Sequence, residues 1–318
     1  MSIRNQILLP VILMAVLLVG SALGVSIWQF SGYVNNSVMD ETNRSLKGLA
    51  DEVDGQKQDA LVKAKVLAGY PGLAAAIAAN DTNAVLALAT PIVKELKLDF
   101  LTVTNATGAV VARTHEPAKR GDSVANQANV VNALKGTAVS FVEPGTVVKL
   151  SVRAGVPVRN ATGAVVGAIS AGYQLDKMEM VDHVKQLFGP DFTVFFGDVR
   201  LSTTIVVDGK RAIGTKLDPA IAKTVLTEGK EFHGRTTILN QPYLTAYMPL
   251  LGPDNKPIGV LFAGKNVKEA ESIISNMQLM IGGIGIILLA LSLVVMFFII
   301  RRITGPLGIA VDDLGQLA

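Results

Sequence analysis

Residues 148–172 read VKLSVRAGVPVRNATGAVVGAISAG, and this stretch decides the fold of the region around it. Apolar and polar residues alternate from Val148 to Arg153, which is the period of a β-strand with one buried face. The sequence Asn160-Ala161-Thr162-Gly163 then favours a tight turn, because Asn tolerates the left-handed conformation and Gly favours it. A further apolar run ends at Gly172. The stretch therefore predicts two antiparallel strands joined by a hairpin.

The same kind of sequence recurs further along the chain. Landmarks of the segment Asp99–Asp176 reappear 92 positions later in the segment Asp191–Val267. The matching pairs are Asp99 and Asp191, Pro157 and Pro249, Gly167 and Gly259, and Gly172 and Gly264. A repeat of this length indicates two copies of one structural unit. Each copy predicts a strand, a hairpin, a helix (127–134 or 219–226) and three more strands, which makes an α+β region of two antiparallel-sheet modules, at 95–176 and 190–267.

A long helix is expected before the first module. Residues 34–70 contain no proline, and apolar residues recur there at roughly helical spacing. These residues are Val34, Val38, Leu46, Leu49 and Val53. Such a helix is long enough to carry the chain past one module to the other. Its apolar stripe indicates packing against its own domain, a dimer seam, or both.

Two apolar runs enclose this whole region. Residues 7–28 and 277–300 each form a run of about 20 residues without a charged side chain, enough for a helix that crosses the hydrocarbon core of a bilayer. Arg4 precedes the first run, and Arg301 and Arg302 follow the second. The positive-inside rule predicts a two-pass membrane protein, with residues 1–6 and 301–318 in the cytoplasm and residues 33–275 outside.

The first run has a competing interpretation, a cleaved signal peptide with Arg4 in its basic region and Ser21-Ala22-Leu23 near the cleavage site. The length of the run and the aromatic residues Trp28 and Tyr33 at its end favour a membrane span. Gly20-Ser21-Ala22-Leu23-Gly24 is a GxxxG motif, which predicts close packing of a partner helix.

Composition excludes several classes of function. The chain has no cysteine, so disulfides and thiolate chemistry are excluded, and its three histidines lack the spacing of a metal site. A net charge of +3 over 318 residues does not indicate a nucleic-acid-binding protein. The sequence contains no G-x-S-x-G elbow, H-E-x-x-H motif or P-loop. We therefore expect a protein that is not an enzyme and uses no cofactor or metal.

Two small modules that follow a long helix between two membrane spans resemble the double Cache domain of bacterial transmembrane receptors. The resemblance implies a PAS-like antiparallel sheet in each module. The first module is also similar to citrate and C4-dicarboxylate sensing domains, through Arg113-Thr114-His115-Glu116-Pro117, Ser151-Val152-Arg153 and the later Pro157-Val158 and Gly163-Ala164-Val165-Val166-Gly167. The chain departs from that pattern in three places. Its Arg and His are two positions apart rather than three, the preceding hairpin is longer, and Gly155 stands where citrate sensors have Lys.

Residues 301–307, Arg-Arg-Ile-Thr-Gly-Pro-Leu, are similar to the start of a HAMP linker, with Pro306-Leu307 opening its first helix. This resemblance implies a homodimer and an output domain beyond residue 318. The whole chain resembles the sensory half of a methyl-accepting chemotaxis receptor of the bacterial inner membrane. A histidine kinase or a diguanylate cyclase with the same input domain remains an alternative. So does a receptor for a periplasmic binding protein.

The polar face of the strand at 148–153 predicts the ligand site. Lys149, Ser151 and Arg153 share this face by alternation, and the preceding hairpin adds further basic groups. Because a guanidinium matches a carboxylate bidentately, the set predicts a pocket for a small carboxylate. The expected ligand-binding residues are Arg113, His115, Arg120, Lys149, Ser151, Arg153 and Ser170.

The corresponding strand of the second module is aromatic and neutral. Ser151 aligns with Tyr243 and Arg153 with Thr245, and both share a face with Tyr247. Tyr243, Thr245 and Tyr247 are therefore candidate residues for a different ligand. The favoured interpretation is that they fill a structural module that relays motion.

Overall fold

A computed structural model describes residues 3–316 of the chain. The chain divides into two units. The sensor unit comprises residues 39–266, and the helical unit comprises the residues before Met39 together with those after Asn266.

The helical unit contains parts of two long helices, α1 (Ile3–Ala68) and α7 (Val267–Gln316). Both helices are long and apolar enough to cross a membrane. α1 runs unbroken from the first apolar run to Ala68, so the two helices expected there form one element. α7 likewise continues through Pro306, so the helix start expected at that residue is wrong.

The glycines of the GxxxG motif have open space around them in the described structure. A Cβ added at Gly20 or Gly24 would have no atom within 4 Å. A Cβ at Gly285 would lie 2.6 Å from Leu23 Cδ1, so the close glycine contact within the helical unit is made by α7.

The sensor unit contains two five-stranded antiparallel sheets, which confirms the expected fold class. The first sheet has the order β2-β1-β5-β4-β3 and comprises β1 (Phe100–Asn105), β2 (Val110–Arg113), β3 (Val139–Pro144), β4 (Leu150–Arg159) and β5 (Val165–Gln174). The second has the order β10-β11-β12-β6-β7 and comprises β6 (Asp191–Phe196), β7 (Val199–Thr203), β10 (Phe232–Ile238), β11 (Gln241–Leu251) and β12 (Pro257–Asn266). A separate hairpin joins β8 (Val206–Val207) to β9 (Lys210–Arg211).

The two sheets have the same topology, so the internal repeat is a structural repeat. The register agrees as well, because Arg153 of β4 pairs with Gly172 and Thr245 of β11 pairs with Gly264. The edge pairs agree in kind: a register shift lies between Val103 and Thr104, where β1 pairs with β2, and between Val194 and Phe195, where β6 pairs with β7.

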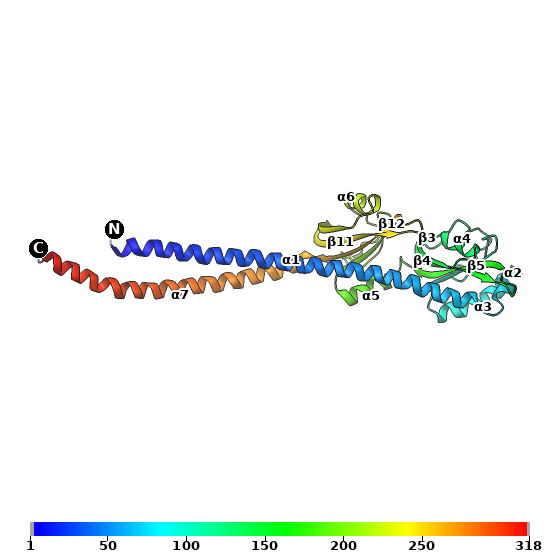
Figure 1. Cartoon of the computed structure of the whole chain (residues 1–318), viewed down its shortest axis with the longest axis horizontal. Coiled ribbons are helices and arrows are strands. Elements are labelled where there is room, and N and C mark those ends of the chain that lie inside the picture. The colour runs from blue at the N-terminus through cyan, green and yellow to red at the C-terminus, as the bar shows by residue number, and fades with distance from the viewer. Residues whose placement is uncertain (1–2, 317–318) are drawn as a thin grey trace. The chain divides into compact units, whose positions relative to one another are not determined.

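Helices cover both faces of each sheet (Figure 1). The helices of the sensor unit other than α1 are α2 (Leu73–Ala78), α3 (Thr82–Glu95), α4 (Ala128–Leu134), α5 (Met178–Phe188), α6 (Pro219–Ala222) and the π-helical turn η1 (Lys223–Thr227). α4 packs on β4 and β5 of the first sheet, and η1 packs on β11 and β12 of the second. These helices match the two predicted at residues 127–134 and 219–226.

The part of α1 within the sensor unit packs along both sheets. Leu46, Leu49 and Val53 are at most 3% exposed. They belong to one hydrophobic cluster that includes Val152 of the first sheet and Leu261 of the second. The apolar stripe of the long helix therefore packs against its own domain, and both modules share one core through it.

Candidate functional site

The two faces of the first sheet differ in chemistry. Val152 of β4 is buried in the core shared with α1. Ser151 and Arg153 lie on the opposite face, as strand alternation requires. Arg153 pairs with Gly172 on β5, and Gly172 pairs with Phe100 on β1, so these three residues form one row across the sheet. We call this side, which α4 covers, the polar face.

Arg153 is 4% exposed, and its guanidinium carbon lies 4.9 Å from the centroid of the Phe100 ring. Its Nη1 donates to Gln127 Oε1 and its Nη2 to the Val148 carbonyl, both at 3.4 Å. The tip packs closely against Gly145, where a Cβ would lie 1.9 Å from Nη2. Burial lowers the pKa of Arg153 to about 10, so the side chain keeps its positive charge at neutral pH.

His115 packs on the same Phe100 ring, edge to face, with the ring centroids 5.6 Å apart. Burial lowers the pKa of His115 to about 4, and the charges of Arg113 and Arg153 contribute to the decrease. The imidazole is therefore neutral at pH 7, where it offers one donor and one acceptor nitrogen.

Acidification is expected to destabilise the sensor unit through His115. A histidine in an unfolded chain titrates near pH 6.5, whereas His115 titrates at about 4 in the folded chain. Between these values the unfolded chain binds more protons, so the free energy of unfolding falls as the pH is lowered from 7. His115→Phe keeps an aromatic ring at Phe100 and removes the titration. Its melting temperature, measured by calorimetry, should therefore change less between pH 7 and 4 than that of the parent, and equal pH dependence would contradict the assignment.

Arg113 is 1% exposed and is held by Asp122. Its two terminal nitrogens each donate to one carboxylate oxygen at 2.7 Å, and Nη1 also donates to the Lys119 carbonyl at 2.8 Å. The hydrogen bonds from Arg113 lower the pKa of Asp122. Arg113 therefore holds the loop between β2 and α4 in place through these hydrogen bonds. The Asp122 carboxylate already balances its positive charge.

Arg120 and Lys149 are both exposed, whereas Arg153 is buried. Arg120 is exposed and lines a separate depression with residues 80–83, at the start of α3. Lys149 is also exposed and precedes β4, which begins at Leu150. Lys149 therefore lies outside the strand whose alternation predicted its place on the polar face.

The second sheet presents Tyr243, Thr245 and Tyr247 on one face of β11, and all three are buried. The Tyr243 hydroxyl donates to Asp191 Oδ2 at 3.2 Å. The Tyr247 ring packs on Phe262, with 4.9 Å between the ring centroids. The aromatic character expected of this face is therefore correct.

The expectation that this face is neutral is wrong, because Arg200 lies on it. Arg200 belongs to the edge strand β7 and pairs with Phe195 of β6. It is 3% exposed, and its guanidinium carbon lies 5.0 Å from the Phe195 ring centroid. Alignment of β4 with β11 cannot reveal a residue from a different strand.

Two family models match these modules. One, described as Single cache domain 3, matches residues 50–183. A second model of the same description matches residues 175–277. Both sheet modules are Cache domains. None of the curated proteins matches the sequence.

Solved sensor domains are similar to this chain in fold. The sensor domain of the Vibrio cholerae histidine kinase DctB is 11% identical with a TM-score of 0.50, over 73% of this chain and 98% of that domain. The ligand-binding domain of the Campylobacter jejuni chemoreceptor Tlp3, in complex with 4-methylisoleucine, is 14% identical with a TM-score of 0.51, over 77% of this chain and 93% of that domain. At these identities the likeness establishes the fold alone.

Five buried polar atoms at the polar face of the first Cache module have no hydrogen-bond partner among the described residues. They are His115 Nδ1, Asn129 Oδ1, Ser151 Oγ, Arg153 Nε and Ser170 Oγ. Ser170 belongs to this face because it pairs with Gly155, two positions from Arg153 on β4. Buried polar atoms in native proteins are almost always paired. Two hydroxyls and a guanidinium N–H can donate, so the cluster suits a ligand that brings acceptor atoms.

Glu143 is a further residue of this site, which sequence reasoning missed. It is 3% exposed, and its carboxylate accepts hydrogen bonds from the backbone N–H of Ala128 at 3.0 Å and of Asn129 at 3.2 Å. It also accepts one from the Asn129 side-chain amide. Burial raises the pKa of Glu143. The carboxylate thus accepts hydrogen bonds from backbone N–H groups at the start of α4, which have no acceptor within the helix. It also places a negative charge near Arg153.

A cavity of about 450 Å³ lies next to this cluster. Gln127, which accepts a bond from Arg153, and Gly145, which packs on its tip, both line the cavity. Glu143 lines it as well. The cavity therefore borders residues that touch the Arg153 guanidinium.

Proposed function

We propose that the chain is the input half of a two-pass receptor of the bacterial inner membrane, whose first Cache module binds a small carboxylate outside the cell. The observation that carries the proposal is the cluster of buried, unpartnered polar atoms around Arg153. A carboxylate supplies acceptors for the guanidinium and for the hydroxyls of Ser151 and Ser170. His115 donates to the ligand or accepts from it through its unpartnered ring nitrogen.

The charges around the cluster favour a ligand with a single carboxylate. Asp122 already balances Arg113, and Glu143 places a negative charge close to Arg153. A second or third carboxylate on the ligand would meet Glu143 without a further cation to balance it. Gly155 supplies no side chain where citrate sensors have Lys. Acetate, lactate and amino acids therefore fit better than citrate, and Arg120 and Lys149 stay outside the proposed site.

The test is calorimetric titration of the 318-residue chain, in nanodiscs, with acetate, lactate, alanine, succinate and phosphate. A ligand at 100 times its Kd adds about 2.7 kcal/mol of stability, so scanning calorimetry gives an independent readout. Arg153→Met removes a charge-assisted hydrogen bond of about 1.5–3 kcal/mol, and we expect it to weaken binding about 10- to 100-fold.

Gly145→Ala is the second variant of this test. Its methyl group would lie 1.9 Å from Arg153 Nη2, so this flexible side chain must move, and 2.9 Å from the Val148 carbonyl oxygen, so the turn before β4 must shift as well. We expect weaker binding in this variant also. Binding that is unchanged in both variants would place the carboxylate site elsewhere.

Transmission is proposed to run through the core that both modules share along α1, and from β12 directly into α7. A ligand that binds one of two conformations of the sensor more tightly increases the population of that conformation. The second membrane helix then transmits the conformational change to a HAMP linker in a homodimer. We favour chemotaxis as the output. A histidine kinase or diguanylate cyclase output, and sensing through a periplasmic binding protein, are the alternatives. A hybrid of residues 1–318 with a chemoreceptor output half should change swimming bias with the ligand, and no response would contradict the proposed transmission.

A further inference from the structure

Arg200 is a buried cation without a carboxylate partner in the described part of the chain. Its Nη1 donates to Thr215 Oγ1, and its Nε is buried with no hydrogen-bond partner. Arg113 and Arg211, by contrast, are paired with Asp122 and Asp182. A buried guanidinium that lacks a counter-charge is costly, so such a residue calls for an explanation.

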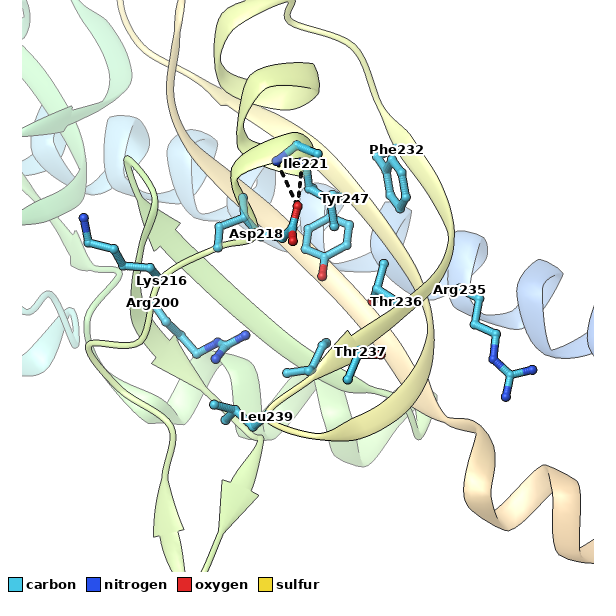
Figure 2. A pocket seen from close by; sticks show the side chains of 13 residues that line it. Arg200, Lys216, Asp218, Ile221, Phe232, Arg235, Thr236, Thr237, Leu239 and Tyr247 are labelled. Atoms are coloured by element: carbon cyan, nitrogen blue, oxygen red, sulfur yellow. Dashed lines mark hydrogen bonds between the residues drawn. The ribbon is translucent and has the colours of Figure 1, made fainter.

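Arg200 lines a cavity of about 430 Å³ in the second Cache module. Figure 2 shows its guanidinium and the Tyr247 hydroxyl directed into this space, while Lys216 and Arg235 point away from it. Apolar side chains form part of the wall, among them Ile221, Phe232 and Leu239. Among the cationic residues of the lining, Arg200 is therefore the one placed to meet a ligand.

Asp218 lines the same cavity and restricts the charge of a ligand that could bind there. Its Oδ1 accepts hydrogen bonds from the backbone N–H of Ala220 and Ile221, which fixes the carboxylate at the start of α6. Arg200 and Asp218 act with opposite sign on the pKa of Tyr247, which burial raises. The Tyr247 hydroxyl thus lies within the electrostatic range of both charges.

We propose that the second Cache module binds its own small ligand, a molecule with one carboxylate and no second negative charge. The guanidinium of Arg200 and the hydroxyl of Tyr247 hold the carboxylate, and Asp218 repels a second anion. A simple monocarboxylate and an amino acid share this chemistry. They differ at Asp218, which attracts the ammonium group of an amino acid. This site is separate from that around Arg153 and does not depend on it.

The probes are acetate, alanine and succinate, each titrated to 50 mM at constant ionic strength into the ¹⁵N-arginine-labelled chain in nanodiscs. The Arg200 Nε–Hε resonance is identified by its loss in Arg200→Lys. We expect acetate, alanine or both to shift this resonance with saturation, in the parent and equally in Arg153→Met. Succinate should bind more weakly. A resonance that no probe shifts overturns the proposal, as does a shift that disappears in Arg153→Met.

Matched variants test the role of each residue. Arg200→Lys keeps the charge and loses the planar fork, so at least a tenfold loss of affinity, measured by calorimetry, is expected. Tyr247→Phe keeps the ring contacts and should weaken binding several-fold. Asp218→Asn keeps an oxygen to cap α6. It should tighten acetate binding, and it should weaken alanine binding if the ligand is an amino acid. Unchanged affinity in all three variants would overturn the site.

Discussion

Gly155→Ala is expected to unfold the first Cache module or displace α4, and with it to abolish binding at Arg153. A Cβ at this position would lie 2.1 Å from the carbonyl oxygen of Asn129 and 2.5 Å from its carbonyl carbon. Both are backbone atoms in the first turn of α4, so no side-chain rotation relieves the clash. Overpacking of this kind lowers the free energy of unfolding by about 1–3 kcal/mol when neighbouring groups can shift. We expect Gly155→Ala to lower it by an amount at or above the upper end of this range.

Urea unfolding of the 318-residue chain measures this loss. The matched control is Gly55→Ala in the sensor-unit part of α1, where a Cβ would have no atom within 4 Å. Alanine favours helix over glycine, so this control should stabilise the chain by about 0.5–1 kcal/mol. Gly155→Ala with the stability of the parent would show that α4 does not rest on β4. The same contact excludes the Lys that citrate sensors have at the corresponding place.

The features predicted correctly from the sequence are those with local or periodic causes. Alternation along β4 placed Ser151 and Arg153 on one face because a strand reverses its side chains at every residue. The repeat predicted a second sheet of the same order, because identical spacing of turns and strands produces identical topology. Alternation holds within a strand, and Lys149 lies in the turn before β4.

The features missed depend on contacts between side chains that no periodic pattern relates. Glu143 reaches the first turn of α4, and Asp122 balances Arg113 across the loop after β2. Arg200 reaches the aromatic face of the second module from the edge strand β7, which the alignment of β4 with β11 does not include. Periodicity indicates which face a side chain takes, but the charges it meets there are set by packing.

Glu143→Ala is expected to cost about 1–3 kcal/mol or more, because it leaves the first backbone N–H groups of α4 without an acceptor and removes a negative charge that acts on Arg153. Glu143→Gln is the matched variant, which keeps one acceptor oxygen and should cost less. Burial raises the folded pKa of Glu143 above its unfolded value, so this residue contributes most to stability at acid pH and less as the pH rises through its folded pKa. The stability of the parent relative to Glu143→Gln should therefore increase as the pH falls from 7 to 5.

The effect of Glu143→Gln on binding separates two kinds of ligand for the first Cache module. Removal of the charge beside Arg153 should tighten binding of a simple carboxylate several-fold, since the ligand no longer meets a like charge. An amino acid would bring an ammonium group, which the Glu143 carboxylate attracts, so the same variant should weaken its binding. Titration of acetate and alanine into the parent and Glu143→Gln measures both effects. Unchanged affinity for both probes would mean that Glu143 acts only on α4, and the charge balance inferred for this pocket would be wrong.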